Sequence, residues 1–348
     1  MGAIRVALFT FFLAVLILGC GSAAHYERSL LVMDTVVSLS AFGDGGKEAV
    51  EESEAWLREF DALASPHGEG SEAARLAEMA GKGYVKLHPE VYRMLELSQE
   101  YSRRTEGAWD VTAGALAELW GIGTDHERIP SPEEIEKAKG LVGWRHLLLR
   151  PEDGSAMLEM PGMSLSLGGI AKGFAVDRVR QIYEKHGVRS GLINMGSSSM
   201  YAVGQKDDHS WRIGLRHPRK EGDGVYLAVI PLKDQALSTS GDYERFMERA
   251  GKRYPHIMDP ATGCPADSGV MSVTIVVDGS HPEAGALSDL LTTAVFVLGP
   301  EKGRALLDSL PEEIRGCILC GDYGVRTSHG LSEKMELLGE EFHLADGE

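Results

Sequence analysis

The stretch SLSLGGIAKGFAVD, residues 164–177, joins a short alternating run of serine and leucine to the start of a helix. Gly168 and Gly169 stand at the junction, and Gly173 follows in the first turn of the helix. Such glycines let the backbone come close to another group, and a helix N-terminus directs free N–H groups at an anion. Lys172 lies in that first turn, where the helix dipole disfavours a cation unless an anion is also present. The stretch therefore predicts a strand, a glycine turn and an anion-facing helix, with a solvated lysine as the alternative.

Helices and short strands alternate irregularly on both sides of this junction. Apolar periodicity and capping signals predict helices at 46–64, 89–103, 131–140, 171–186 and 288–298. A further short helix is predicted after the loop 65–72, ending at about residue 79. A hairpin is predicted over HLLLRPEDGSAMLEM, and further strands near 190–195, 199–204, 210–216, 225–232 and 270–278. Because successive strands are joined by short turns, we expect antiparallel sheets with helices packed on one side, an α+β fold. No G-x-G-x-x-G follows the first strand, which argues against a doubly wound nucleotide fold.

The composition is that of a folded, acidic protein. The 348 residues carry a net charge of −17, with 43% hydrophobic residues. This charge, without any basic stripe, argues against a nucleic-acid binder. An acidic chain that binds a polyanion needs a local positive source, which a metal ion or a few lysines and arginines would supply.

The first twenty residues have the pattern of an export signal. One arginine precedes the apolar run VALFTFFLAVLILG, and Cys20 follows. The ending Ile17-Leu18-Gly19-Cys20 looks like a bacterial lipobox, in which the cysteine is lipidated. We therefore predict a lipoprotein signal peptide over 1–20 and a domain over 25–340, with an uncleaved membrane anchor as the alternative. Both interpretations place the body of the chain outside the cytoplasmic membrane.

The remaining cysteines are Cys264, Cys317 and Cys320, an odd number that leaves at least one free thiol or an intermolecular pair. Cys317 and Cys320 form C-x-x-C within what reads as a strand. Residues three apart on a strand face opposite sides, so we do not expect a metal site or redox pair there.

Three further segments contain more polar and aromatic residues than a packed core alone would require. In 107–123, Trp109 and Asp110 precede a helix that carries Trp120, and a helix cap by Asp110 or Thr112 is the alternative. In 237–246 a hydroxyl-rich turn is expected.

His256 follows in the segment 253–265. A lone histidine is more often structural than catalytic, but Asp242, Arg245 and Asp259 surround it in sequence.

The last of these segments is 286–300. Ser288 is expected to cap a helix that Gly299-Pro300 ends. Asp289 and Thr293 are spaced i, i+4 and share one face. Carboxylate, hydroxyl and carbonyl oxygens suit Mg²⁺, which takes its other ligands from phosphates and water. The alternative is again a cap, with Thr293 bonded back to the helix backbone.

Taken together, these motifs resemble the ApbE family of FAD:protein FMN transferases over roughly residues 30–330. The resemblance is carried by G-x-W-D-V-T with L-W-G-I-G, L-G-G-I-A-K-G-F-A-V-D, N-M-G with W-R-I-G, S-T-S-G-D-Y-E-R, H-I-M-D-P-x-T-G and S-D-x-L-x-T-A. The stretch SPHGEGSEAARLAEM departs from the family pattern, because the aromatic residue and the asparagine that relatives often have there are missing.

The resemblance implies a T-fold-like α+β arrangement and a set of site residues. Mg²⁺ would be held by the Ala171 carbonyl and by the Asp289 and Thr293 side chains, with Thr292 adding a carbonyl. His256 would be the catalytic base. The contacts to FAD would come from Met33, Ala108, Trp109, Asp110, Lys172, Asp177 and Ile257.

The implied function is Mg²⁺-dependent transfer of the FMN moiety of FAD to a threonine hydroxyl of exported acceptor proteins, with release of AMP. The acceptors would be threonine-containing subunits of membrane redox complexes or other exported flavoproteins. The enzyme would be lipid-anchored, facing the periplasm or the outer side of a bacterial cytoplasmic membrane. Hydrolysis of FAD to FMN and AMP, or FAD binding without catalysis, are the alternatives.

Overall fold

The computed structural model describes residues 24–345, apart from residues 66, 67, 69, 197, 221, 223 and 329. The predicted signal peptide and Cys20 lie outside the described residues. Within those residues, no helix is both long enough and apolar enough to cross a bilayer.

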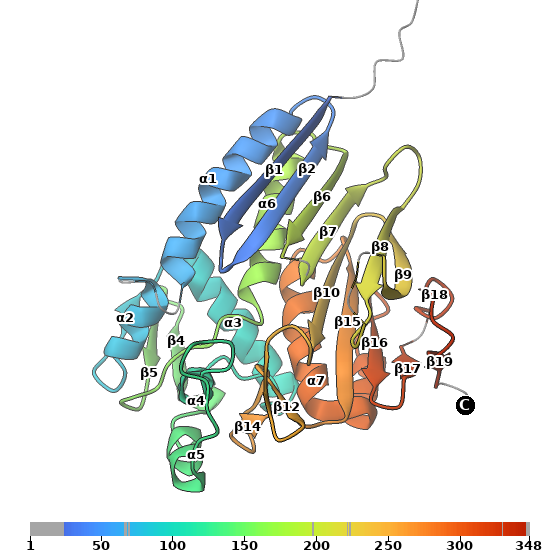
Figure 1. Ribbon diagram of the computed structural model, residues 1–348. Helices are drawn as coiled ribbons and strands as arrows, with labels where there is room; N and C mark the ends of the chain where they lie inside the picture. The colour runs from blue at the N-terminus through green and yellow to red at the C-terminus, as the bar shows by residue number, and fades with distance from the viewer. Residues whose placement is uncertain are drawn as a thin grey trace, which may run out of the picture.

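A nine-stranded sheet runs through the centre of the described part of the chain (Figure 1). Neighbouring strands are antiparallel except for the last pair, which is parallel. The strands, in spatial order, are β1 (His25–Val32), β2 (Thr35–Phe42), β6 (Ser190–Met195), β7 (Ser199–Gly204), β10 (Gln235–Gly241), β15 (Val270–Asp278), β16 (Ile314–Cys320), β17 (Gly324–Thr327) and β19 (His343–Leu344). The predicted strands at 190–195, 199–204 and 270–278 are confirmed.

Three helices cover one face of this sheet side by side (Figure 1). They are α1 (Gly46–Ala64), α6 (Ala171–Lys185) and α7 (Ala284–Ser309). The opposite face is covered by a three-stranded sheet of β8 (Trp211–Arg216), β9 (Tyr226–Leu232) and β18 (Glu336–Leu337). The fold is therefore α+β with helices on one side of the main sheet, as predicted.

The central strand β15 shows why its sequence reads as a continuous apolar run. Val273 and Ile275 pack towards the helices, whereas Met271 and Val276 pack towards the small sheet. Because both faces of β15 are buried, both sets of side chains are apolar.

The remaining elements surround the lower end of the helical layer in Figure 1. Ser131 caps the start of α5, as the sequence predicts, and it also makes a full capping box with Glu134. The predicted hairpin is the pair β4 and β5. The other bounds are α2 (Glu72–Glu78), β3 (Val85–Lys86), α3 (Pro89–Arg104), α4 (Gly114–Trp120), α5 (Pro132–Lys139), η1 (Trp144–His146), β4 (Leu147–Arg150), β5 (Ser155–Leu158), β11 (Phe246–Arg249), β12 (Lys252–Pro255), β13 (Met258–Asp259) and β14 (Cys264–Pro265).

Two local predictions around the hydroxyl-rich segments are wrong. The run 164–167 is not a strand; Ser164 forms only an isolated bridge with Ala113, although Leu165 and Leu167 are buried. The segment Ser238–Gly241 is not a turn but the end of strand β10.

The helix predicted at 288–298 begins earlier and runs on further. Ser288 lies inside α7 and does not cap it, and its hydroxyl donates to the Gly285 carbonyl at 2.8 Å. Gly299 has φ 80° and kinks the helix at the predicted end, but a second segment continues from Pro300 to Ser309. The glycine and proline therefore redirect the helix where the sequence predicted that they stop it.

Cys317 and Cys320 face opposite sides of β16, as the sequence predicts for residues three apart on a strand. Cys317 points into the core between the two sheets, whereas Cys320 points into the core under the helices. Both thiols and that of Cys264 are free.

Candidate functional site

The start of α6 crosses the first half of α7 at a pair of glycines, Gly173 and Gly285. A Cβ atom on Gly173 would lie 2.6 Å from the Cβ of Asp289, which leaves room only for glycine. The Gly173 N–H donates to Oδ2 of Asp289 at 2.9 Å. The crossing therefore holds the Asp289 carboxylate against the first turn of α6.

Asp289 is a buried carboxylate, 5% exposed, near a cation. Burial raises the pKa of Asp289, while the charge of Lys172, the hydrogen bond from the Gly173 N–H and the nearby Ser199 hydroxyl act to lower it. The burial of this charge costs free energy in the unliganded protein. A carboxylate kept at such a cost is typical of a site that binds a cation.

The glycine turn before α6 lies against Thr293 and Trp109. A Cβ atom on Gly169 would lie 2.9 Å from Oγ1 of Thr293 and 2.8 Å from the indole ring of Trp109. Trp109 is 3% exposed, and its Nε1 finds no hydrogen-bond partner among the described residues. A buried donor without a partner costs free energy, so this orphaned N–H points to a group that completes the site.

The side chain of Lys172 contacts the chain just before α6. Its Nζ donates to the Gly168 carbonyl at 2.9 Å, so the half-buried side chain folds back over the glycine turn. Its positive charge acts on both Asp289 and His256. Lys172 therefore places a positive charge at the crossing, and its contact with a bound anion stays a prediction.

The turn that carries Trp109 is fixed by Asp110. Oδ1 of Asp110 accepts from the backbone N–H and the hydroxyl of Thr112 at 2.8 Å and 2.7 Å, and Oδ2 accepts from the Trp144 N–H at 2.8 Å. The N-cap of α4 is Ala113, which makes no side-chain cap bond, so the capping alternative is wrong. Burial raises the pKa of Asp110, and these bonds oppose that shift.

Among the described residues, His256 has a hydrogen-bond partner for only one of its two ring nitrogens. Its backbone N–H and its Nδ1 both bond to the Arg245 carbonyl, at 3.0 Å and 3.1 Å. Because a carbonyl can only accept, Nδ1 carries the proton, and Nε2 of the neutral ring keeps its lone pair. Burial, followed by the positive charges of Arg245 and Lys172, lowers the pKa of His256 to about 4. The ring is therefore neutral at pH 7, because its pKa lies well below the ordinary histidine value.

The sequence and the fold identify the family of this chain. The family model described as the ApbE family matches residues 33–318. The chain belongs to the ApbE family.

Named relatives and solved structures of the ApbE family cover most of the chain. It is 33% identical to the FAD:protein FMN transferase of Treponema pallidum, over 93% of each protein. It is 31% identical to one from Klebsiella pneumoniae, over 72% of this chain and 76% of that protein. The crystal structure of the ApbE protein from Thermotoga maritima superposes with a TM-score of 0.81 and 30% identity, covering 89% of this chain and 99% of that one. The flavin transferase ApbE from Vibrio cholerae gives 0.75 and 26%, covering 86% and 94%.

The metal ligands predicted from the ApbE resemblance lie together at the crossing of α6 and α7. Ala171, Asp289 and Thr293 border the glycine turn. The hydroxyl of Thr292 donates to the Asp289 carbonyl at 2.6 Å and contacts the Ser240 hydroxyl at 2.8 Å, so Thr292, not Thr293, makes the predicted back-bond. No group of three or more His, Cys, Asp or Glu gathers as a metal site in the described ranges. The ligand set predicted from the resemblance is not such a group, because it contains one carboxylate and otherwise neutral hydroxyl and carbonyl oxygens.

Three predicted FAD contacts of the ApbE family lie in different settings. Met33 is at the tip of the β1–β2 hairpin with φ 55°. Ile257 is buried directly after His256. The carboxylate of Asp177 accepts from the backbone N–H groups of Gly285 and Ala286, at 2.7 Å and 2.8 Å, and burial raises the pKa of Asp177 to about 7. Contact of these residues with FAD stays a prediction.

The sequence analysis did not identify two features of the site. One is Ser199, which lies near Asp289, and the other is the set of hydroxyl contacts between β10 and α7. Ser238 contacts Ser288 at 2.7 Å, as Ser240 contacts Thr292. The i, i+2 spacing of Ser238 and Ser240 was the available signal, because these residues share one face of a strand.

Proposed function

We propose that this chain is a FAD:protein FMN transferase, which moves the FMN moiety of FAD to a threonine hydroxyl of an acceptor protein and releases AMP. The observation that carries the proposal is His256, whose Nδ1 bond to the Arg245 carbonyl leaves Nε2 of the neutral ring able to take a proton. A base and a positive charge beside the anionic substrate are the two elements that this reaction needs. The named relatives support the same activity.

The residues at the crossing fit Mg²⁺. The Asp289 carboxylate, the Thr293 hydroxyl and the Ala171 carbonyl are hard oxygen donors, to which Thr292 adds a carbonyl. The single carboxylate leaves positions for phosphate oxygens and water. When bound, the ion supplies Lewis acidity that neutralises the charge of the FAD pyrophosphate.

The chain's own residues account for the remaining steps. The acceptor hydroxyl oxygen attacks the phosphorus of the FMN phosphate, the bond from that phosphorus to the bridging oxygen breaks, and AMP leaves with the bond electrons. Nε2 of His256 takes the hydroxyl proton. Lys172 holds the anion in place with the positive charge of its side chain. Positioning and electrostatics then supply most of the rate, as in other phosphoryl transfers.

Two other functions would use the same residues. Water in place of threonine gives hydrolysis of FAD to FMN and AMP, and loss of the base gives a FAD-binding protein. Incubation with FAD, Mg²⁺ and a threonine-containing acceptor protein separates them. We expect a flavin covalently attached to the acceptor and free AMP. Free FMN with an unmodified acceptor would instead identify a hydrolase, and intact bound FAD a binder.

We further propose that Cys20 is lipidated and anchors the enzyme outside the cytoplasmic membrane. The support is the lipobox pattern at residues 17–20. The variant Cys20→Ser is expected to remain unlipidated, because only the thiol can take the diacylglyceryl group. Carbonate washing of membranes should then release the variant but not the parent protein. Unchanged retention of the variant would favour an uncleaved membrane anchor.

A further inference from the structure

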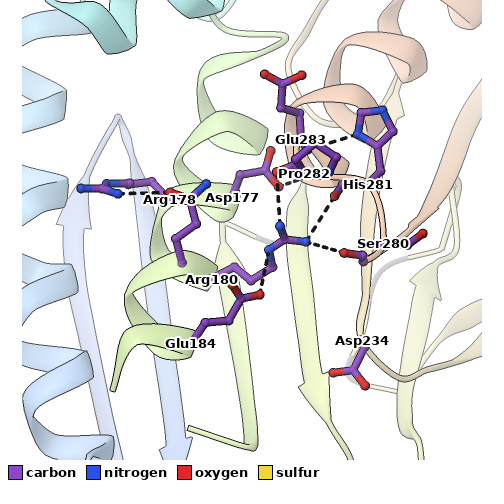
Figure 2. A network of polar contacts seen from close by, with 12 residues as sticks. Asp177, Arg178, Arg180, Glu184, Asp234, Ser280, His281, Pro282 and Glu283 are labelled. Atoms are coloured by element: carbon purple, nitrogen blue, oxygen red, sulfur yellow. Dashed lines mark hydrogen bonds and ion pairs between the residues drawn. The ribbon is translucent and has the colours of Figure 1, made fainter. Parts of the chain in front are cut away.

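Arg180 on α6 is a buried cation that holds the loop leading into α7 (Figure 2). Its side chain is 7% exposed. Nη1 donates to the carbonyls of Gly279 and His281 at 3.0 Å and 3.3 Å, and Nη2 donates to the carbonyl of Pro282 at 3.3 Å. A buried guanidinium that is shared among three carbonyls of one loop fixes the path of that loop.

Asp177, one turn earlier on the same helix, holds the next part of the chain. Its two carboxylate oxygens accept from the N–H groups of Gly285 and Ala286. The N-cap residue of α7, Glu283, makes no side-chain cap bond, so the cap comes from α6 instead. One helix thus presents a cation to the carbonyls before α7 and an anion to the N–H groups at its start.

This arrangement, which we call the α6 clamp (Asp177 and Arg180), lies one turn away from the candidate metal residues. Gly285 comes four residues before Asp289, and Asp289 itself accepts from Gly173 of α6. α7 is therefore held against α6 at its loop, at its first N–H groups and at Asp289. A change in the first two contacts would shift the third.

We propose that Arg180 is a positioning residue that, through the α6 clamp, sets the distance from the Asp289 and Thr293 oxygens to the Ala171 carbonyl. The proposal rests on the function proposed above, in which these oxygens hold a divalent cation. Mg²⁺ demands near-ideal octahedral geometry at about 2.0–2.1 Å, whereas Ca²⁺ accepts irregular shells at about 2.3–2.6 Å. A small displacement of α7 should therefore weaken Mg²⁺ binding more than Ca²⁺ binding.

The test compares the two metals in the variant Arg180→Lys, which keeps the charge but loses the planar set of donors. The readout is the quenching of FAD fluorescence by the full chain, titrated with Mg²⁺ and separately with Ca²⁺. We expect the Mg²⁺ midpoint to rise about 10- to 100-fold, the usual effect of losing a residue that orients metal ligands. The Ca²⁺ midpoint should rise several-fold less.

Arg178→Lys is the matched control. Arg178 lies on the same helix, but its side chain is 42% exposed and contacts Gln181 and Glu90 instead of α7. Its metal midpoints should equal those of the parent protein.

Unchanged midpoints in Arg180→Lys, or equal losses for both metals together with a lower melting temperature, would overturn the positioning role. If Arg180→Lys does not fold, Asp177→Asn tests the other half of the α6 clamp with the same expected difference between metals. If FAD binding by the parent protein needs no divalent ion, the metal site of the proposed function is wrong and the proposal falls with it.

Discussion

Asp289→Ala is expected to lower FAD turnover by about 10³-fold, because it removes the single charged oxygen from the candidate metal site. A bound metal ion typically supplies several kcal/mol of transition-state stabilisation, and each 1.36 kcal/mol corresponds to tenfold in rate. The substitution also leaves the Gly173 N–H without its acceptor. Steady-state AMP release, measured against Mg²⁺ concentration, is the readout.

Asp289→Asn separates the charge from the packing. The amide oxygen still accepts from Gly173, but the buried charge is gone. Burial raises the pKa of Asp289 in the folded state above its unfolded value. The parent protein without ligand therefore loses stability as the pH rises from the ordinary carboxyl range through that raised pKa. We expect the asparagine variant to lack this loss, and so to melt at the same or a higher temperature at neutral pH, although it is inactive.

Asp308→Ala is the control on the same helix, because Asp308 pairs with Arg304 far from the site. It should turn over FAD at the parent rate. Normal turnover with an unchanged Mg²⁺ requirement in Asp289→Ala would show that Asp289 is not a metal ligand.

His256→Asn is expected to slow FMN transfer by about 10²- to 10⁴-fold, the usual contribution of a general base. The asparagine amide can still donate to the Arg245 carbonyl, but it cannot take a proton. FAD affinity and melting temperature should change little. Because the pKa of the free protein's His256 is lowered to about 4, kcat/KM of the parent should lose activity through this group only near pH 4. The pH profile of the variant should lack this decrease in kcat/KM near pH 4.

His209→Asn, at an exposed position between β7 and β8, is the matched control and should behave as the parent protein. Transfer at nearly the parent rate in His256→Asn, or failure of that variant to fold, would mean that His256 is structural. Asp242 is then a weak candidate for the catalytic base, because both of its carboxylate oxygens accept hydrogen bonds from Arg219 at 2.7 Å.

Sequence patterns correctly predicted the helices whose formation depends on residues close together in the sequence. The capping box at Ser131 and the amphipathic face of α1, with Val50, Leu57 and Phe60 buried, need only neighbours in sequence. The segment 238–241 failed for the opposite reason. Its serines favour turns in isolation, yet here they bond to hydroxyls on α7 fifty residues away, and this tertiary contact keeps them in a strand.

The start of α7 could not be predicted from its own residues. Its cap, Asp177, comes from α6 more than a hundred residues earlier. The sequence therefore placed the helix start at Ser288, the nearest residue of a capping type. The pair Asp289 and Thr293 was still found, since their spacing depends only on the helix itself. The proximity of Ser199 and the lowered pKa of His256 depend on packing, which no local pattern contains.

The opposite orientation of Cys317 and Cys320 on β16 bears on how the two thiols can react. Neither thiol can reach the other through the sheet, and both are buried. Burial raises the pKa of Cys320, and that of Cys317 to about 11, so very little thiolate is available at pH 7. The thiolate is the form that oxidants and disulfide exchange attack. Formation of this part of the described fold therefore depends on no disulfide bond at β16, and mild oxidants should leave both thiols unmodified while the sheet stays folded.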